Sequence, residues 1–168
     1  MKKRIVIHDL SEEQFNKLGL SLENSTVIAA DGKYAPCRGC FGCWLKTPGK
    51  CVMKDKLQNI ATQIVSSDEL MIISENCYGG YTSRVKNIID RSIATSLPFF
   101  AFRNKQIHHA RRYPKKQIDL VVYLYGDMTE KEKRLAEKLV VANGINAAYR
   151  STKLHIVGKL ESLKEMIS

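Results

Sequence analysis

The fold is decided by residues 70–80, LMIISENCYGG, where an apolar run meets a polar, glycine-rich turn. The first four residues are all apolar, which is typical of a strand buried on both faces of a parallel sheet. Apolar residues then recur at helical spacing, at Val85, Ile88, Ile89 and Ile93. The stretch therefore predicts a buried strand, a turn and an amphipathic helix.

The same alternation of strands and helices runs along the rest of the chain. Further strands are expected at residues 4–8, 25–30 and 120–124, and at either 145–149 or 154–157. A helical stripe over residues 57–65 and a short helix at the C-terminal end complete the pattern. This alternation predicts an α/β fold, in which helices cover both faces of a parallel sheet.

Two capping boxes mark where helices begin. In each box a hydroxyl residue precedes the helix and a longer polar residue reaches back from three positions later, as in Ser11 with Gln14 and Thr129 with Glu132. Gly144 is expected to end the second of these helices, because glycine readily adopts the left-handed conformation that closes a helix.

Length and composition indicate one globular domain. The chain has 168 residues, of which 44% are hydrophobic and 26% are charged, and residues 1–168 contain no linker or repeat. No apolar stretch is long enough to cross a membrane, and the start has too few apolar residues for a secretory signal. A cytoplasmic protein is therefore expected. In that reducing compartment, five cysteines are not expected to form a disulfide framework.

The net charge of +10 is unevenly spread. No Asp or Glu lies between Arg91 and Ile118, and most of this stretch is a basic excursion, residues 97–117, inserted between two elements. Its cations can form a solvated loop, bind a phosphate or contact another subunit. Nucleic acid is not expected as a partner, because the chain carries no recognition-helix, zinc-finger or RNA-binding motif.

A dense group of cysteines occupies the cysteine loop, residues 36–51. Four of the five cysteines lie here, at Cys37, Cys40, Cys43 and Cys51. Four thiolates can bind a [4Fe–4S] cluster, or zinc in a closed tetrahedral site. They can equally remain free thiols near a cofactor or exchange disulfides, and the spacing leaves these alternatives open.

Two stretches resemble a known family. Residues 74–91, SENCYGGYTSRVKNIIDR, resemble the loop and helix of flavodoxin-like NAD(P)H-dependent FMN reductases. Residues 40–51, with Lys54 and Asp55 behind them, are similar to the cysteine loop of the same group, to which iron-sulfur flavoproteins belong. The resemblance covers roughly residues 25–150. It implies a flavodoxin-like three-layer sandwich with a five-stranded parallel sheet.

The resemblance also implies an FMN site beyond the carboxyl ends of the strands, where ligands gather in open α/β sheets. Gly79 and Gly80 would let the backbone approach the flavin ring, which Tyr78 and Tyr81 would cover. No catalytic residue is assigned, because the cofactor carries the redox chemistry. The expected cofactor-binding residues are Ser74, Glu75, Asn76, Cys77, Tyr78, Gly79, Gly80, Tyr81, Tyr125, Gly126 and Asp127.

One departure from the family pattern bears on the FMN phosphate. The family usually follows its first strand with a loop rich in Gly, Ser and Arg that cradles this phosphate. Residues 8–13 here read HDLSEE, and their three carboxylates would repel it. The excursion around Arg103, Arg111 and Arg112 can supply the missing positive charge. Otherwise the flavodoxin fold has lost its cofactor.

The function expected from the sequence is electron transfer. An FMN-binding oxidoreductase would pass electrons from NAD(P)H to a small acceptor, such as a quinone or another flavin, as a cytoplasmic homodimer or higher oligomer without a membrane partner. Two alternatives stay open. One is a cofactor-free binding or regulatory module on the same fold, and the other is an electron carrier whose four cysteines hold a [4Fe–4S] cluster.

Overall fold

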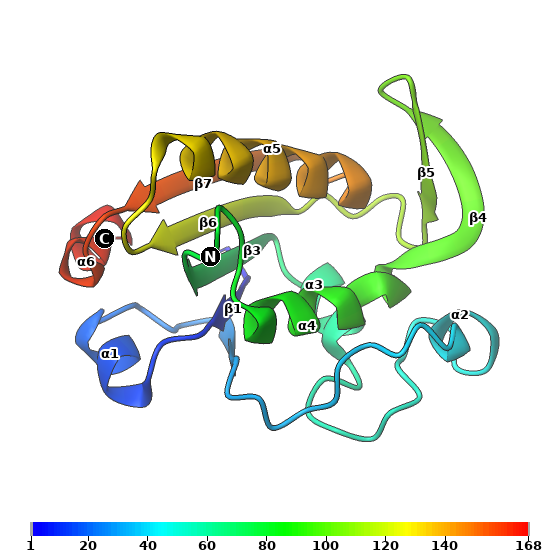
Figure 1. The fold of residues 1–168 in the computed structure, drawn as a ribbon. Helices are drawn as coiled ribbons and strands as arrows, with labels where there is room; N and C mark the ends of the chain where they lie inside the picture. Colours follow the sequence, from blue (N-terminus) through cyan, green and yellow to red (C-terminus); the bar gives the residue numbers. More distant parts are fainter. Residues whose placement is uncertain (1, 168) are drawn as a thin grey trace.

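The computed structural model describes residues 2–167, and its centre is a five-stranded parallel sheet in the order β2-β1-β3-β6-β7 (Figure 1). All four neighbouring pairs in this sheet are parallel. The strands are β1 (Arg4–His8), β2 (Ser25–Ala29), β3 (Glu69–Glu75), β6 (Asp119–Tyr125) and β7 (Ser151–Val157). The expected three-layer α/β sandwich is confirmed.

Helices cover both faces of the sheet, because successive strand residues point to opposite sides. On one face, Ile5 and Ile7 of β1 pack in a cluster with α3 (Ile60–Val65), α4 (Ser83–Arg91) and α5 (Glu130–Ala147). On the other face, Val6 packs with α1 (Glu12–Lys17) and α6 (Leu163–Ile167). Two 3₁₀ turns, η1 (Ser92–Thr95) and η2 (Leu160–Ser162), complete this part of the chain.

Both capping boxes are confirmed. The Ser11 hydroxyl accepts a hydrogen bond from the Gln14 backbone N–H, and the Gln14 side chain accepts one from the Ser11 N–H. The same reciprocal pair joins Thr129 and Glu132 at the start of α5.

The expected end of α5 at Gly144 is wrong, because the helix continues to Ala147 and closes at the left-handed Ala148. Gly144 is needed for packing instead, since a Cβ on it would lie 2.1 Å from Thr152 Oγ1 of β7. The alternative strand at residues 145–149 is therefore excluded, and the last strand, β7, includes the expected residues 154–157. Helix α3 begins at Ile60, three residues later than its stripe predicted.

The basic excursion is a β-hairpin and not a loop. Strand β4 (Ser96–Arg103) pairs with β5 (Gln106–Arg111) in a separate antiparallel sheet. Asn104 and Lys105 join them with φ angles of 50° and 61°, the left-handed conformation at both central positions that a tight hairpin turn requires. We call residues 96–111 the arm. It projects from the body at the end of the sheet opposite to the strand arrowheads (Figure 1).

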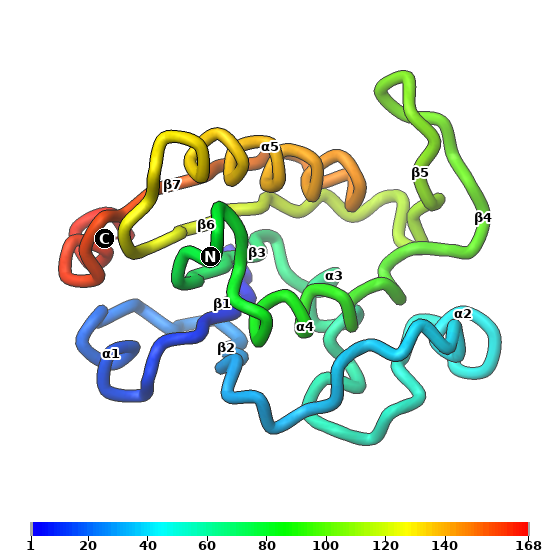
Figure 2. Tube along the Cα trace, in the orientation of Figure 1, coloured from blue at the N-terminus to red at the C-terminus, as the bar shows by residue number. Residues whose placement is uncertain are grey.

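The cysteine loop lies at the same end of the molecule as the arm. After β2 the chain runs along the body to a short helix, α2 (Gly42–Leu45), close to the base of the arm (Figure 2). The Trp44 ring lies 4.8 Å from the His109 ring of β5, centroid to centroid.

Over residues 2–167, no helix has the length and apolar character needed to span a bilayer.

Candidate functional site

The carboxyl ends of β1, β3 and β6 meet at one carboxylate, Asp9. Its oxygens accept hydrogen bonds from Ser74 Oγ (3.0 Å), Thr82 Oγ1 (2.7 Å), Tyr125 Oη (3.1 Å) and the Glu75 N–H (3.1 Å). Strand order reverses at β1, which has β2 on one side and β3 on the other, so this is the edge where α/β folds bind ligands. The structure thus brings the two expected loops together around a residue that sequence reasoning did not assign to the site.

We call the meeting point of the β1, β3 and β6 loops at Asp9 the Asp9 junction. Tyr125 stays protonated in this junction. Burial raises the pKa of this phenol, and the negative charge of Asp9 raises it further. Tyr125 therefore keeps its hydroxyl proton and donates a hydrogen bond to the Asp9 carboxylate across the physiological range. The hydrogen bond joins the end of β6 to the end of β1, 116 residues apart in the chain.

Asn76 joins the two expected walls of the site directly. Its side-chain Nδ2 donates to the Asp127 carbonyl oxygen at 2.8 Å, and its backbone N–H donates to the Tyr125 carbonyl oxygen at 2.8 Å. Its Oδ1 accepts from the Gly79 N–H at 2.8 Å. These bonds occupy the side-chain amide and the backbone N–H of Asn76, one of the expected cofactor-binding residues.

The two glycines of the loop have different roles. Gly79 has a φ of 81°, and a Cβ there would lie 2.6 Å from the Glu132 carbonyl oxygen in the first turn of α5. Gly80 has ordinary space, with Leu139 at 3.4 Å. Packing of the loop on α5 therefore requires glycine at residue 79, and this reason differs from the expected approach of a ring.

The two tyrosines of the loop, Tyr78 and Tyr81, also differ in burial. Tyr81 is only 7% exposed and its hydroxyl accepts a hydrogen bond from Asn143 Nδ2 at 3.1 Å, while burial raises its pKa to about 12. Tyr81 thus belongs to the core, which corrects its expected role of covering a ring. Tyr78 is 85% exposed and has a left-handed φ of 53°, and the neighbouring Cys77 is exposed as well. Tyr78 is the aromatic side chain that this loop presents to solvent.

A cavity of about 680 Å³ lies beside the junction, under the loops that follow β1 and β2. Asp9, Glu12 and Asp31 contribute carboxylates to its wall, and Lys33 and Arg84 contribute cations. Asp31 is neutralised by Lys56, whose Nζ lies 2.6 Å from Asp31 Oδ1 and lowers the pKa of that carboxyl. The remaining positive charge in the wall is at Lys33 and Arg84, neither of which was among the expected cofactor-binding residues.

The flavin implied by the family resemblance fits part of this edge. Exposed Tyr78 offers an aromatic surface for the ring. The loop after β1 does not fit the phosphate, because Glu12 and Glu13 open the short α1 and the Ser11 hydroxyl is engaged by Gln14. Lys33 and Arg84 are the cations in the wall of the cavity, and Asp9, Glu12 and Asp31 lie in the same wall.

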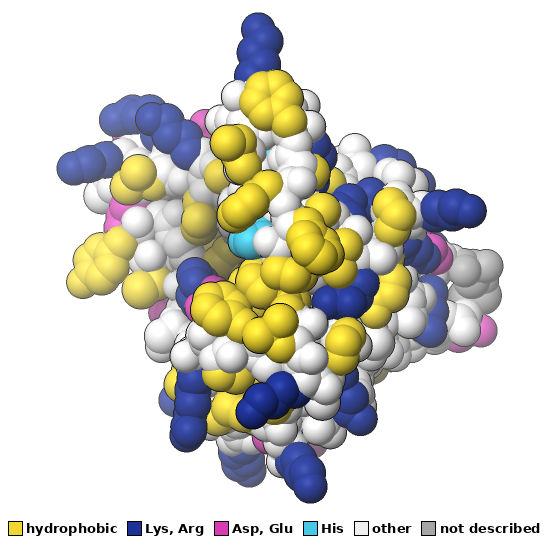
Figure 3. All heavy atoms as spheres, turned by 90° about the vertical axis from the view of Figure 1, so that its right-hand side faces the viewer, with side chains coloured by type: hydrophobic (Ala, Val, Ile, Leu, Met, Phe, Trp, Pro, Cys, Tyr) yellow, Lys and Arg dark blue, Asp and Glu magenta, His cyan; other side chains and the backbone are white. Residues whose placement is uncertain are grey.

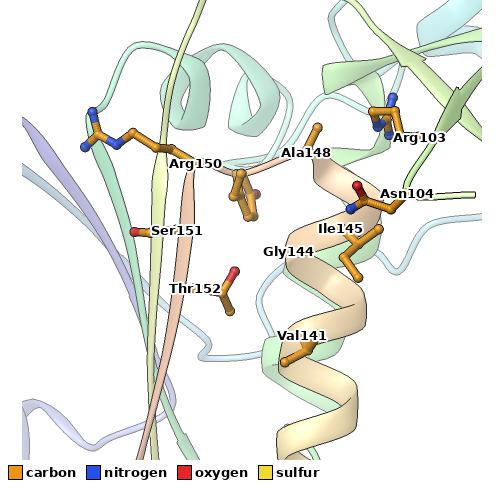
Figure 4. Close-up of a pocket in the computed structure, with 10 residues that line it drawn as sticks. Arg103, Asn104, Val141, Gly144, Ile145, Ala148, Arg150, Ser151 and Thr152 are labelled. Atoms are coloured by element: carbon orange, nitrogen blue, oxygen red, sulfur yellow. The ribbon is translucent and has the colours of Figure 1, made fainter.

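Within one chain the arm lies at the end of the sheet opposite to the strand ends that surround Asp9 (Figure 1). Arg103 of the arm donates to the His109 and Asn146 carbonyl oxygens, and Arg112, which follows the arm, donates to the Ala94 carbonyl oxygen. A second cavity, of about 450 Å³, lies between the end of α5 and β7, where Arg150 points away from the hollow and toward Asp119 (Figure 4). A role of the basic excursion around Arg103 in binding a phosphate stays a prediction.

The four cysteines of the loop differ in exposure. Cys37 and Cys40 are exposed, Cys43 is half-buried and Cys51 is buried. Burial raises the pKa of the Cys43 thiol, and the other three sulfurs add to this shift, Cys51 most strongly. Among residues 2–167, no three His, Cys, Asp or Glu side chains are placed to hold a metal ion together. Metal or cluster binding by these cysteines stays a prediction.

The cysteine loop is held by a buried ion pair, at a distance from the Asp9 junction. Arg91, at the end of α4, donates to both Asp55 oxygens (2.7 and 2.8 Å) and to the Ala35 carbonyl oxygen (2.7 Å). The junction contacts Thr82, which precedes the first residue of the same helix. Nine helical residues, roughly 13 Å at 1.5 Å each, separate Thr82 from the end of α4, and the packing of these thiols beside a flavin stays a prediction.

Comparisons with known proteins agree with the sequence motifs. No family model matches the chain. An iron-sulfur flavoprotein of Methanocaldococcus jannaschii is 31% identical over 84 residues, which are 50% of this chain and 42% of that protein. An iron-sulfur flavoprotein of Archaeoglobus fulgidus is 28% identical over 104 residues, 62% of this chain and 49% of that protein. The matched part of the chain thus spans less than half the length of these relatives.

Solved structures share the fold over nearly the whole chain. The NAD(P)H:quinone oxidoreductase from Methanothermobacter marburgensis superposes with a TM-score of 0.62 and 12% identity, covering 99% of this chain and 95% of that one. A putative quinone reductase from Klebsiella pneumoniae has a TM-score of 0.62 and 11% identity, covering 95% and 76%. The chain has the flavodoxin-like fold of these reductases, and its sequence is similar to that of iron-sulfur flavoproteins, as the motifs predicted.

Proposed function

We propose that this chain is an FMN-dependent oxidoreductase that passes electrons from NAD(P)H to a small acceptor such as a quinone. The observation that carries the proposal is the meeting of the β1, β3 and β6 loops at Asp9, on the edge where strand order reverses. Similarity to iron-sulfur flavoproteins in sequence and to quinone reductases in fold supports the same activity.

In this proposal the chain's residues bind and orient the cofactor. Tyr78 covers the ring, and Lys33 and Arg84 hold the phosphate. Bound FMN supplies the hydride and electron transfer, and the protein supplies position, electrostatics and exclusion of water. Asp9 keeps the three loops in one arrangement, so it acts as a positioning residue.

The proposal is tested by comparing FMN with riboflavin, which lacks the phosphate. Binding of each is measured by flavin fluorescence titration of the purified chain and of the Arg84→Ala variant. Removal of one charge-assisted contact is expected to weaken FMN about 10-fold and to leave riboflavin unchanged. The matched control is Lys138→Ala, which removes an exposed cation from α5. A Tyr78→Ala variant should weaken both flavins equally.

Two results would contradict the proposal. A chain that binds neither flavin is the cofactor-free module. A chain that binds FMN and riboflavin equally, with no effect of Arg84, places the cofactor elsewhere. Oxidation of NADH and NADPH by the FMN-loaded protein, with a quinone as acceptor, then tests the activity.

A second candidate function is electron transfer by a cluster on the cysteine loop. The observations that favour it are the four cysteines within residues 37–51 and the similarity of the chain to iron-sulfur flavoproteins. Iron and sulfide assays on protein purified without oxygen test it. A Cys40→Ser variant should lose iron while keeping FMN, because the loop and the Asp9 junction lie at opposite ends of α4. Wild-type protein without iron would rule this candidate out.

A further inference from the structure

A further cavity lies inside the α/β sandwich, between the ends of α4 and α5 on the same face of the sheet. Its volume is about 420 Å³, and its floor is formed by Leu70, Ile72 and Leu120 of strands β3 and β6. Leu70 and Leu120 are the paired second residues of their strands, so this cavity lies over the amino-terminal half of the sheet. We call it the inner cavity. Asp9 lies beyond the carboxyl ends of the strands, so the inner cavity is separate from the candidate flavin site.

Two helices and the arm form the walls of the inner cavity. Ile89 comes from the end of α4 and Ile93 from η1, while Asn143 comes from the last turns of α5. His109 of the arm closes the wall between them. Figure 3 looks at this end of the molecule and shows hydrophobic side chains gathered on it, with Lys and Arg mainly around them. The inner cavity therefore has an apolar floor and apolar surroundings.

Two tyrosine hydroxyls in the wall have unused hydrogen-bond donors. The Tyr81 hydroxyl accepts from Asn143 Nδ2 at 3.1 Å, and its own proton has no acceptor among residues 2–167. The Tyr149 hydroxyl has no hydrogen-bond partner in this part of the chain. Burial raises the pKa of Tyr81 to about 12 and also raises the pKa of Tyr149, so both phenols stay protonated at neutral pH. Each of them therefore has an O–H group that can donate to a bound molecule.

The charge of the wall favours uncharged ligands. No lysine or arginine of residues 2–167 lines the inner cavity, so a phosphate would find no cation there. Asp90 is the only carboxylate in the described wall, and it forms an ion pair with Lys86 on the same helix. The Ser92 and Ser96 hydroxyls already donate to backbone carbonyls. An ion that entered the cavity would therefore lose its hydration without gaining a partner of opposite charge.

These features together define the chemical class of a ligand. The apolar floor suits a hydrocarbon ring, the phenol donors suit a carbonyl oxygen, and the absence of free charge in the described wall disfavours ions. The volume of about 420 Å³ lies within the range of about 300–1,000 Å³ that is typical of small-molecule sites. We propose that the inner cavity binds a neutral ring compound with a carbonyl group, whose oxygen accepts a hydrogen bond from Tyr149, with Tyr81 as the neighbouring donor. This proposal is independent of the flavin site, and no electron transfer is assigned to the inner cavity.

The probe for this site is α-tetralone, a neutral bicyclic ketone that flavins do not reduce. Its binding is followed through the backbone and side-chain amide signals in nuclear magnetic resonance spectra of the purified chain, with and without added FMN. Saturable binding with a dissociation constant of about 1 mM or lower is expected in both cases. The side-chain amides of Asn143 and Asn146, which line the cavity, should show the largest shifts. Naphthoate, a bicyclic anion, should not bind there.

The Tyr149→Phe variant removes the hydroxyl that has no partner in the described chain, so the fold should be unchanged. It should weaken α-tetralone about 5-fold, which corresponds to one neutral hydrogen bond. Binding of tetralin, a bicyclic hydrocarbon without oxygen, should be unchanged in the same variant. The matched control is Tyr123→Phe, which removes a phenol hydroxyl from the opposite face of the sheet and should alter the binding of neither compound.

Each other outcome overturns the proposal. A wild-type chain that shows no saturable binding of α-tetralone lacks the site. Shifts that centre on Tyr78 and Asp9 and disappear when FMN is added would place the ketone in the flavin site instead. Equal effects of Tyr149→Phe on the ketone and the hydrocarbon would show that this hydroxyl is not the donor, and binding of naphthoate in the cavity would contradict the charge argument. Far-ultraviolet circular dichroism checks folding, and Tyr81→Phe replaces Tyr149→Phe if that variant is unfolded.

Discussion

Arg91 and Asp55 form a two-pronged ion pair that joins the last residue of α4 to the segment behind the cysteine loop. The Arg91 side chain is fully buried and that of Asp55 is 19% exposed. Asp55 also accepts hydrogen bonds from the Ala35 and Leu57 backbone N–H groups, at 3.1 and 3.0 Å. The pair therefore fixes both ends of the cysteine loop, residues 36–51, against one helix.

Replacement of Asp55 by Asn should cost about 3 kcal/mol of unfolding free energy, because it leaves the Arg91 guanidinium buried without an anion. Urea denaturation measures the loss. Asp90→Asn is the matched control, since it breaks the exposed Lys86–Asp90 pair on the same helix and should cost less than about 0.5 kcal/mol. Equal losses of unfolding free energy in the two variants would show that the Arg91–Asp55 pair stabilises the chain no more than a surface ion pair does.

Stability should fall in acid as Asp55 loses its charge. The Arg91 hydrogen bond lowers the pKa of Asp55 to about 2, below the value of about 3.9 that an unfolded chain has. The stabilisation is therefore complete above about pH 4 and is lost as the pH falls toward 2. The pKa of Asp119 is also lowered, mainly by its hydrogen bond with Arg150, so protonation of Asp119 in acid lowers the stability as well.

The measurement is the unfolding free energy as a function of pH for the wild type and for Asp55→Asn. The variant should show a smaller slope between about pH 4 and pH 2. Parallel curves would mean that Asp55 has the same pKa in the folded and unfolded states.

Replacement of Asp9 by Asn should cost about 2 kcal/mol, because an amide has one acceptor oxygen where four donors converge on a carboxylate. The change also removes the charge that raises the pKa of Tyr125, so this phenol should titrate at lower pH in an ultraviolet difference titration. Glu12→Gln removes an exposed carboxylate nearby and serves as the control. A Tyr125 titration unmoved by Asp9→Asn would contradict the hydrogen bond between them.

Replacement of Gly79 by Ala should destabilise the chain by about 3 kcal/mol, from left-handed strain together with the contact of 2.6 Å to the Glu132 carbonyl oxygen. The Gly39→Ala variant separates the cost of left-handed strain from the cost of the steric contact. Gly39 also has a positive φ, of 62°, but a Cβ there meets nothing within 4 Å, so its cost should be about 1 kcal/mol. Thermal denaturation compares the variants, and a Gly79→Ala cost no larger than that of Gly39→Ala would remove the packing argument.

Sequence reasoning succeeded where the signal is local. Capping boxes at Ser11 and Thr129 involve residues three positions apart, and the apolar run over residues 70–73 is continuous, so short stretches contain the whole signal. It failed at Gly144, which looks like a helix end but allows α5 to pack on Thr152. Sequence reasoning also missed the arm, because the left-handed turn at Asn104 and Lys105 contains no glycine, the residue that usually indicates such a turn.

The sequence by itself determined the α/β class and the order, along the chain, of the strands of the parallel sheet and of the helices that cover it, because hydrophobic periodicity and turn chemistry act between near neighbours. Only the tertiary structure decided which groups meet. Asp9 gathers donors from as far away as Tyr125, Arg91 finds Asp55, and Tyr81 enters the core while Tyr78 stays exposed. Such partners are separated by 36 to 116 residues. Their pairing depends on how the sheet and helices pack, and no local pattern records that.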